Sequence, residues 1–160
     1  MDPLRLARAL AVVNTVADGL VVAGYQRTYD LPRSRRRLGL RAALVAGYAA
    51  VLAADDLVWA VETGARPPQP EDAALQAHES ALLVVTGANA VAWGLVWWAG
   101  RGVPQAMRRR GVARPNALLG PLLGAGTAIT AAPGHWAYAR GRAAEVARTR
   151  AAAVSGTGGR

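Results

Sequence analysis

Apolar and polar residues follow one another in long blocks along this chain. Four apolar blocks stand out, at roughly 9–25, 42–61, 80–100 and 116–139. The last two contain no Asp, Glu, Lys or Arg, whereas a surface helix of that length in a water-soluble protein has a charged face. About 20 apolar residues are enough to cross a hydrocarbon core of about 30 Å. The pattern therefore predicts an all-α fold, an integral membrane bundle of four transmembrane helices.

The predicted helices form one transmembrane domain, residues 1–144, and cover about 7–25, 42–61, 72–100 and 116–139. Residues 145–160 are predicted to be a basic, partly disordered tail, because untethered chain ends are seldom ordered. An alternative for the first block is a secretory signal, although Asp18 interrupts it and no Ala-x-Ala site follows. An alternative for the fourth is a segment that re-enters the membrane, since Pro121 and Pro133 can each break a helix.

Composition narrows the class of protein. The chain has 160 residues, 52% of them hydrophobic, and all 19 of its basic residues are Arg. The absence of Lys and Phe indicates a GC-rich bacterial genome. There is no Cys, which excludes disulfides, thiolate metal sites and cysteine nucleophiles. The net charge of +9 is typical of nucleic-acid binding, but the Arg residues are grouped between apolar blocks, so we do not expect nucleic acid as a partner.

Most of the Arg residues lie in two segments between the apolar blocks, and both segments are predicted to be loops. Segments 26–41 and 101–115 hold 11 of the 19 Arg, and four crossings place both segments on one side of the membrane. The positive-inside rule then predicts that both segments are cytoplasmic and that both termini lie outside the cell membrane. The basic tail argues for the opposite orientation. The clusters expected to set the topology or to bind anionic lipid head groups are Arg35, Arg36, Arg37, Arg108, Arg109 and Arg110.

Acidic residues near the end of the second apolar block form the main candidate site. Asp55 lies about 9 Å inside the predicted helix end, where a carboxylate needs a proton, a partner or water. The predicted topology brings both His residues to a similar level, and the candidate ligands are Asp55, Asp56, Glu62, His78, Glu79 and His135. Such side chains would bind a cation or a metal, or relay protons. The alternative is that the helix ends in the head-group region and these side chains are solvated.

A second set of polar residues is expected deeper in the bundle. Its members are Asn14, Asp18, Thr86 and Asn89. Hydrogen bonds between such side chains commonly hold transmembrane helices together, and a conduction path is the alternative. Gly120 and Gly124 have the small-residue spacing that lets two helices approach closely, either within one chain or in a dimer.

Two functional hypotheses follow from the sequence. It contains no phosphate-binding loop, no Gly-x-Ser-x-Gly elbow, no dinucleotide fingerprint and no compact metal-binding spacing, so the reaction, the metal and the cofactor are unknown. The first hypothesis is a small multi-pass membrane protein that acts as a non-enzymatic subunit or accessory protein. Its partners would be the lipid bilayer and either membrane proteins or a second copy. The second hypothesis is a transporter or membrane enzyme that uses the acid and histidine pocket around Asp55.

Overall fold

The computed structural model describes residues 2–64, 94 and 102–156, and this part of the chain is helical and contains no strand. The elements are α1 (Pro3–Arg27), the short 3-10 helix η1 (Thr28–Asp30), α2 (Arg35–Thr63), α4 (Gly102–Arg109) and α5 (Pro115–Gly156). The predicted all-α class is confirmed for these residues. The predicted helix at 72–100 lies outside the described residues except for Gly94.

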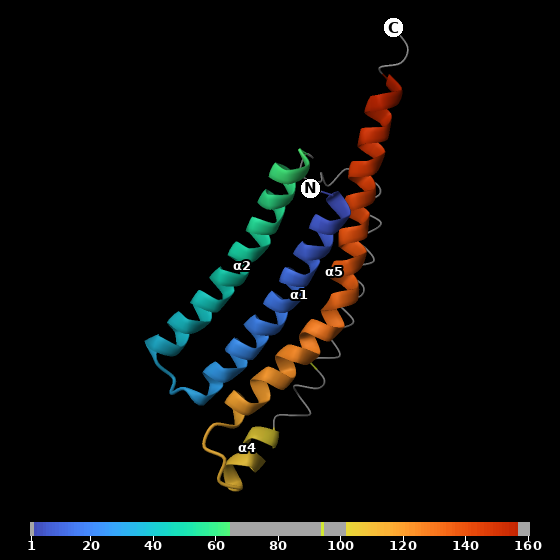
Figure 1. The fold of residues 1–160 in the computed structure, drawn as a ribbon. Helices are drawn as coiled ribbons and strands as arrows, with labels where there is room; N and C mark the ends of the chain where they lie inside the picture. Colours follow the sequence, from blue (N-terminus) through green and yellow to red (C-terminus); the bar gives the residue numbers. More distant parts are fainter. Residues whose placement is uncertain (1, 65–93, 95–101, 157–160) are drawn as a thin grey trace.

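Helix α1 lies between α2 and α5, and its more extensive contact is with α5 (Figure 1). Helix α1 runs in one direction along the bundle, and α2 and α5 run in the opposite direction. The α1–α2 connection and α4 therefore lie at one end, which we call the Arg-rich end. The N-terminus, the end of α2 and the last turns of α5 lie toward the other end, the terminal end (Figure 1).

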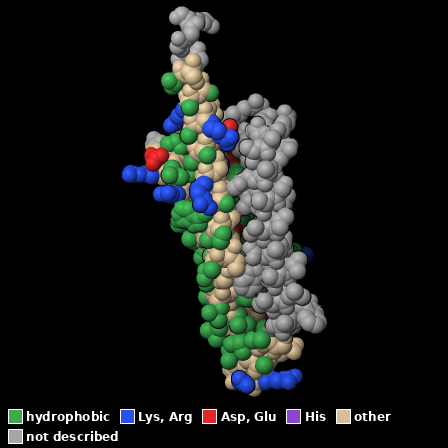
Figure 2. All heavy atoms as spheres, turned by 90° about the vertical axis from the view of Figure 1, so that its right-hand side faces the viewer, with side chains coloured by type: hydrophobic (Ala, Val, Ile, Leu, Met, Phe, Trp, Pro, Cys, Tyr) green, Lys and Arg blue, Asp and Glu red, His purple; other side chains and the backbone are tan. Residues whose placement is uncertain are grey.

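Three of the described helices are long and apolar enough to cross a membrane. They cover Pro3–Asp30, Arg35–Thr63 and Pro115–Ser155. Figure 2 shows hydrophobic side chains along the described face of the bundle, with Arg side chains gathered above and below them. An uncharged band between two charged ends is the surface expected of a protein whose middle lies in hydrocarbon.

Helices α1 and α2 both begin earlier than the sequence pattern predicted. The Asp2 carboxylate accepts a hydrogen bond from the Leu4 amide at 3.0 Å, so α1 starts at Pro3 rather than near residue 7. Helix α2 starts at Arg35 instead of residue 42, because the Ser34 hydroxyl caps its first turn. The prediction that segment 26–41 is a loop is therefore wrong except at residues 31–34, because α1 and η1 continue to Asp30 and α2 begins at Arg35.

Helix α5 is much longer than predicted. It has 42 residues and continues past residue 139 to Gly156, so the described part of the tail, which was predicted to be partly disordered, is helical. Pro121 and Pro133 lie inside the helix without ending it, although Figure 1 shows the helix bending along its length. The last turns are rich in Ala and Arg, which are strong helix formers. A helix of this length measures roughly 60 Å and would project well beyond a hydrocarbon core of about 30 Å.

Segment 101–115, predicted as a loop, contains the eight-residue helix α4. Its last turn carries Arg108 and Arg109, and the chain then turns at Gly111, whose φ of 85° is unfavourable for other residues. Among the predicted head-group arginines, Arg35, Arg36, Arg108, Arg109 and Arg110 are exposed. The Arg37 guanidinium lies 4.9 Å from the centre of the Tyr29 ring, so this Arg also contacts the protein.

A cluster of polar side chains joins the helices at the Arg-rich end. The buried Asp30 carboxylate, which follows α1, accepts hydrogen bonds from the Asn116 side chain at 2.7 Å and from the Ala117 amide at 2.8 Å. Asp30 therefore caps the start of α5 from a distant part of the chain. The Arg108 guanidinium lies 3.3 Å from the same carboxylate, and the Gln26 amide donates to Asn116 at 2.9 Å. These contacts fix the start of α5 against the end of α1.

Candidate functional site

A buried ion pair links α2 to α5 toward the terminal end of the bundle. The Arg142 guanidinium donates from Nη1 to Asp55 Oδ2 at 2.7 Å, and the two side chains are 5% and 7% exposed respectively. Asp56 Oδ1 lies 3.5 Å from Arg142 Nη2, but its side chain is 64% exposed. Because a buried carboxylate is costly without a partner, Arg142 explains how Asp55 is accommodated in an apolar helix.

Aromatic rings enclose the Arg142 guanidinium. The Trp59 ring centre lies 4.6 Å from its central carbon and the Tyr138 ring centre lies 5.1 Å away. Asp55 and Trp59 are four residues apart on α2, and Tyr138 and Arg142 are four residues apart on α5, so each pair shares a helix face. The charge is thus held by a carboxylate and two π faces, a set of contacts that stabilises a desolvated guanidinium.

A second polar cluster joins three helices. Asp18 of α1 accepts a hydrogen bond from the Tyr48 hydroxyl of α2 at 2.5 Å, and its other oxygen lies 2.8 Å from His135 Nε2 of α5. The Asp18 and His135 side chains are largely buried. Each oxygen of the carboxylate thus has a partner from a different helix, which makes Asp18 a junction of the bundle.

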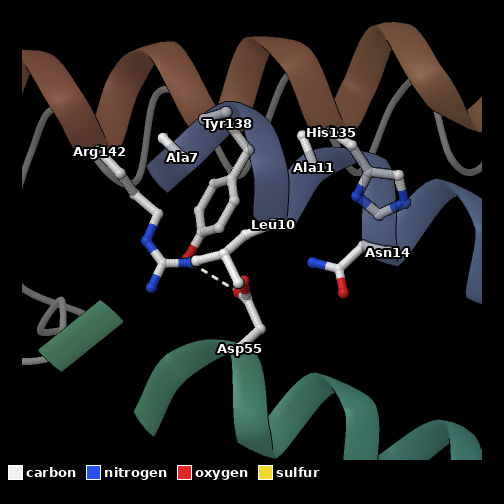
Figure 3. Close-up of a pocket in the computed structure, with 9 residues that line it drawn as sticks. Ala7, Leu10, Ala11, Asn14, Asp55, His135, Tyr138 and Arg142 are labelled. Carbon is white, nitrogen blue, oxygen red and sulfur yellow. Dashed lines mark hydrogen bonds and ion pairs between the residues drawn. The ribbon is translucent and has the colours of Figure 1, made fainter. Parts of the chain in front are cut away.

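Residues of both clusters line a cavity of about 10 Å³. Its walls are formed by Ala7, Leu10, Ala11, Asn14, Asp55, His135, Tyr138, Ala139 and Arg142 (Figure 3). Asn14 Oδ1 and Asp55 Oδ1 are buried and have no hydrogen-bond partner among the described residues. The same holds for Arg142 Nε and Nη2. Such a volume is sufficient for about one water molecule, and a polar wall favours its occupancy.

The structure brings together part of the predicted acid and histidine set. Asp55 and His135 line the cavity, and Asp56 contacts the Arg142 guanidinium without lining the cavity. Glu62 is exposed and does not line the cavity. His78, Glu79, Thr86 and Asn89 lie outside the described residues. The described residues contain no group of three or more His, Asp or Glu side chains that would hold a metal ion.

The structure also joins two sets that the sequence analysis kept apart. Asn14 and Asp18 were placed deeper in the membrane than Asp55 and His135, yet Asn14 lines the same cavity and Asp18 binds His135. The reason is that α1 and α5 lie side by side and antiparallel, which brings His135 level with Asp18. Sequence reasoning missed Arg142, Tyr48 and Tyr138. The available signal for Arg142 was the requirement of the buried Asp55 for a basic partner.

The two predicted packing glycines contact α1. A Cβ atom at Gly120 would lie 2.7 Å from the Ala23 carbonyl oxygen, and one at Gly124 would overlap the Gly19 carbonyl oxygen. Backbone atoms of α1 and α5 therefore approach each other directly at these positions. Of the two alternatives, contact within the chain is the one that the structure uses.

The arrangement is suited chemically to hydrogen bonding and to proton exchange between carboxylate, imidazole, hydroxyl and water. Comparisons of this chain with protein-family models, with curated proteins and with solved structures found no match, so the proposals that follow depend on its own residues.

Proposed function

We propose that this chain is a small multi-pass membrane protein that acts as a non-enzymatic subunit or accessory protein and packs against partners through its helices. The exposure of α2 is the observation that carries this proposal. The helix has 29 residues and is long and apolar enough to span a membrane, yet Asp55 and Trp59 are its only buried residues. A helix with so little buried surface within its own chain needs lipid or another protein around it.

The exposed side chains of α2 are large and apolar. They include Leu38, Val45, Leu52, Leu57, Val58 and Val61. Exposure of apolar area to water costs about 25 cal/mol per Å², so a row of such residues is unfavourable on a water-soluble protein. Lipid removes this cost, and so does a partner helix. The charged groups described in the interior are paired within the bundle, which favours a structural role for them.

Co-purification tests the subunit role. An affinity-tagged full chain extracted from native membranes in mild detergent should carry a stoichiometric membrane-protein partner or a second copy. Leu52→Trp on the exposed face of α2 should weaken that association, and the matched variant Leu20→Trp on the exposed face of α1 should not. Recovery of the chain in a detergent-free extract would overturn the membrane placement. Recovery as a lone monomer from membranes would overturn the subunit role alone.

We also propose that the Arg-rich end faces the cytoplasm, in the cell membrane of a bacterium with a GC-rich genome. The positive-inside rule supports this orientation, since 10 of the described Arg residues lie at the Arg-rich end and 6 lie toward the terminal end. The absence of native Cys makes the test direct. In intact cells, Ser34→Cys should be protected from an impermeant thiol reagent and Glu62→Cys should be labelled. The reverse pattern would invert the orientation.

The cavity favours a second candidate function, a transporter or membrane enzyme that uses the pocket around Asp55. Two buried oxygens without protein partners, beside an Asp–His pair inside an apolar bundle, are groups that can bind a cation or relay a proton. Proteoliposomes that contain the full chain should then show cation or proton flux. Asp55→Asn and His135→Ala should each reduce that flux, and wild-type flux in both variants would exclude this candidate.

A further inference from the structure

Two residues that line one cavity each carry a buried acceptor without a hydrogen-bond partner among the described residues. These acceptors are Asn14 Oδ1 and Asp55 Oδ1. Asn14 is 6% exposed and Asp55 is 7% exposed. A buried polar atom without a partner costs about 1–3 kcal/mol, and this cost is removed if one small ligand satisfies several such atoms.

We propose that this cavity binds a single water molecule, and that His135 exchanges its ring proton through that water. The volume of about 10 Å³ leaves room for one water molecule and for no larger ligand. Water also has the complementary chemistry. Its two hydrogens can be donated to the oxygens of Asn14 and Asp55, and a lone pair of its oxygen can accept from the His135 ring.

Figure 3 shows Asn14 and His135 on one side of the cavity, with Asp55, Tyr138 and Arg142 on the other. His135 Nε2 is already engaged with Asp18, so Nδ1 is the ring nitrogen left for the water. The ring can therefore be hydrogen-bonded at both nitrogens, to a carboxylate on one side and to a water on the other. This is the arrangement through which an imidazole passes protons.

Charge balance gives this exchange a physical reason. The charged and titratable groups that face His135 from the described helices are Asp18 of α1, Tyr48 and Asp55 of α2, and Tyr138 and Arg142 of α5. Asp56 also lies 3.5 Å from the guanidinium, but its side chain is 64% exposed and therefore screened by solvent. With a neutral ring, the two buried carboxylates of Asp18 and Asp55 face one guanidinium, which leaves one net negative charge in the buried site. A proton on His135 balances that charge.

The proposed step conserves protons and charge. The charged ring releases its Nδ1 proton to the water oxygen, and the water passes one of its own hydrogens to Asp55 Oδ1. The products are a neutral ring, an unchanged water molecule and a neutral carboxyl group. The reverse step restores the ion pair between Asp55 and Arg142.

This inference rests on the membrane placement proposed above and requires neither transport activity nor a partner subunit. Its test uses the full chain in lipid nanodiscs of phosphatidylcholine and phosphatidylglycerol. The chain has two His residues, so His78→Gln leaves His135 as the single ¹⁵N-labelled imidazole. Nuclear magnetic resonance then measures the rate at which the His135 ring proton exchanges with bulk water.

In this background, Asn14→Leu removes one water ligand at similar volume, and Ala11→Val fills the cavity. Each should slow the exchange about tenfold, the effect of losing roughly 1.4 kcal/mol of hydrogen bonding. The control Val13→Leu adds bulk to the exposed face of α1 and should leave the rate unchanged. If Ala11→Val does not fold, Asn14→Leu decides alone.

Unchanged exchange in the folded variants, or no measurable exchange in the His78→Gln parent, would overturn the water site. A flux measurement in proteoliposomes distinguishes the water site from the transporter candidate. Exchange that depends on Asn14 without any flux supports the water site and rejects transport. A chain that does not insert into nanodiscs at all rejects the membrane placement and this inference with it.

Discussion

Helices α1 and α5 are held together differently in the two halves of the bundle. Toward the Arg-rich end, Gly19, Ala23, Gly120 and Gly124 bring the two backbones into direct contact. Toward the terminal end, the helices enclose buried polar side chains, a water-sized cavity and an ion pair that reaches across to α2. The same helix pair thus changes from close backbone packing to polar contacts within a few turns.

The difference shows what each kind of contact can do in lipid. Lipid tails are as apolar as Leu, so the burial of apolar side chains between helices stabilises their association little. Close packing of small residues and hydrogen bonds between helices provide the stabilisation instead. The glycine half uses close packing and involves two helices. The polar half uses side chains long enough to join three helices, and it leaves space for water. Asp18 and Gly19 are adjacent in sequence and mark the boundary between the halves.

The largest expected change in the free energy of unfolding comes from a substitution in the polar half. Asp55→Ala should destabilise the folded chain by about 3–5 kcal/mol, because it leaves the Arg142 guanidinium buried without its carboxylate. Asp56→Ala is the matched control, since that neighbouring carboxylate is mostly exposed and should contribute less than about 1 kcal/mol. The measurement is the free energy of unfolding in mixed micelles as sodium dodecyl sulfate is added.

A double variant sharpens this result. Asp55→Leu combined with Arg142→Met replaces the pair by apolar side chains and should recover most of the lost stability. A double variant as unstable as Asp55→Ala would show that the polar half depends on the pair itself rather than on avoiding an unpaired charge.

The next largest effect on stability contrasts Gly124 of the glycine half with Gly47, an exposed glycine of α2. Gly124→Ala should destabilise the chain by about 1–3 kcal/mol, because its Cβ would overlap the backbone of Gly19, which cannot move aside cheaply. Gly47→Ala on α2 meets nothing within 4 Å and should stabilise the chain by up to about 1 kcal/mol through helix propensity. Thermal unfolding in detergent measures both. The same sign for both variants would argue against close packing at Gly124.

The smallest effect is at the boundary between the halves. Tyr48→Phe removes the hydroxyl that donates to Asp18 and should cost about 1–2 kcal/mol. The loss should depend on the charge of the acceptor, Asp18. In an Asp18→Asn background, Tyr48→Phe should therefore lower the free energy of unfolding by less than it does in the wild-type chain. Equal costs in the two backgrounds would show that Tyr48 contributes by packing rather than through the carboxylate.

Much of the architecture was predictable from local patterns. The apolar blocks around 9–25, 42–61 and 116–139 coincide with described helices, because their length and hydropathy are properties of the segments themselves. The helix ends were predicted less well. The Ser34 cap precedes a run of Arg residues that the sequence analysis assigned to a loop. The Ala-rich continuation of α5 was assigned to a partly disordered tail.

The sequence alone determined which segments are apolar, that Asp55 needs a partner and that Gly120 and Gly124 permit close approach. Tertiary structure decided that Arg142 is that partner, that His135 binds Asp18 and that Asn14 lines the same cavity as Asp55. The physical reason is sequence separation. These contacts join residues on different helices, 87 residues apart for Arg142 and Asp55, and 117 for His135 and Asp18. No local pattern specifies these contacts, because they depend on the position of each helix along its neighbours and on the length of each side chain.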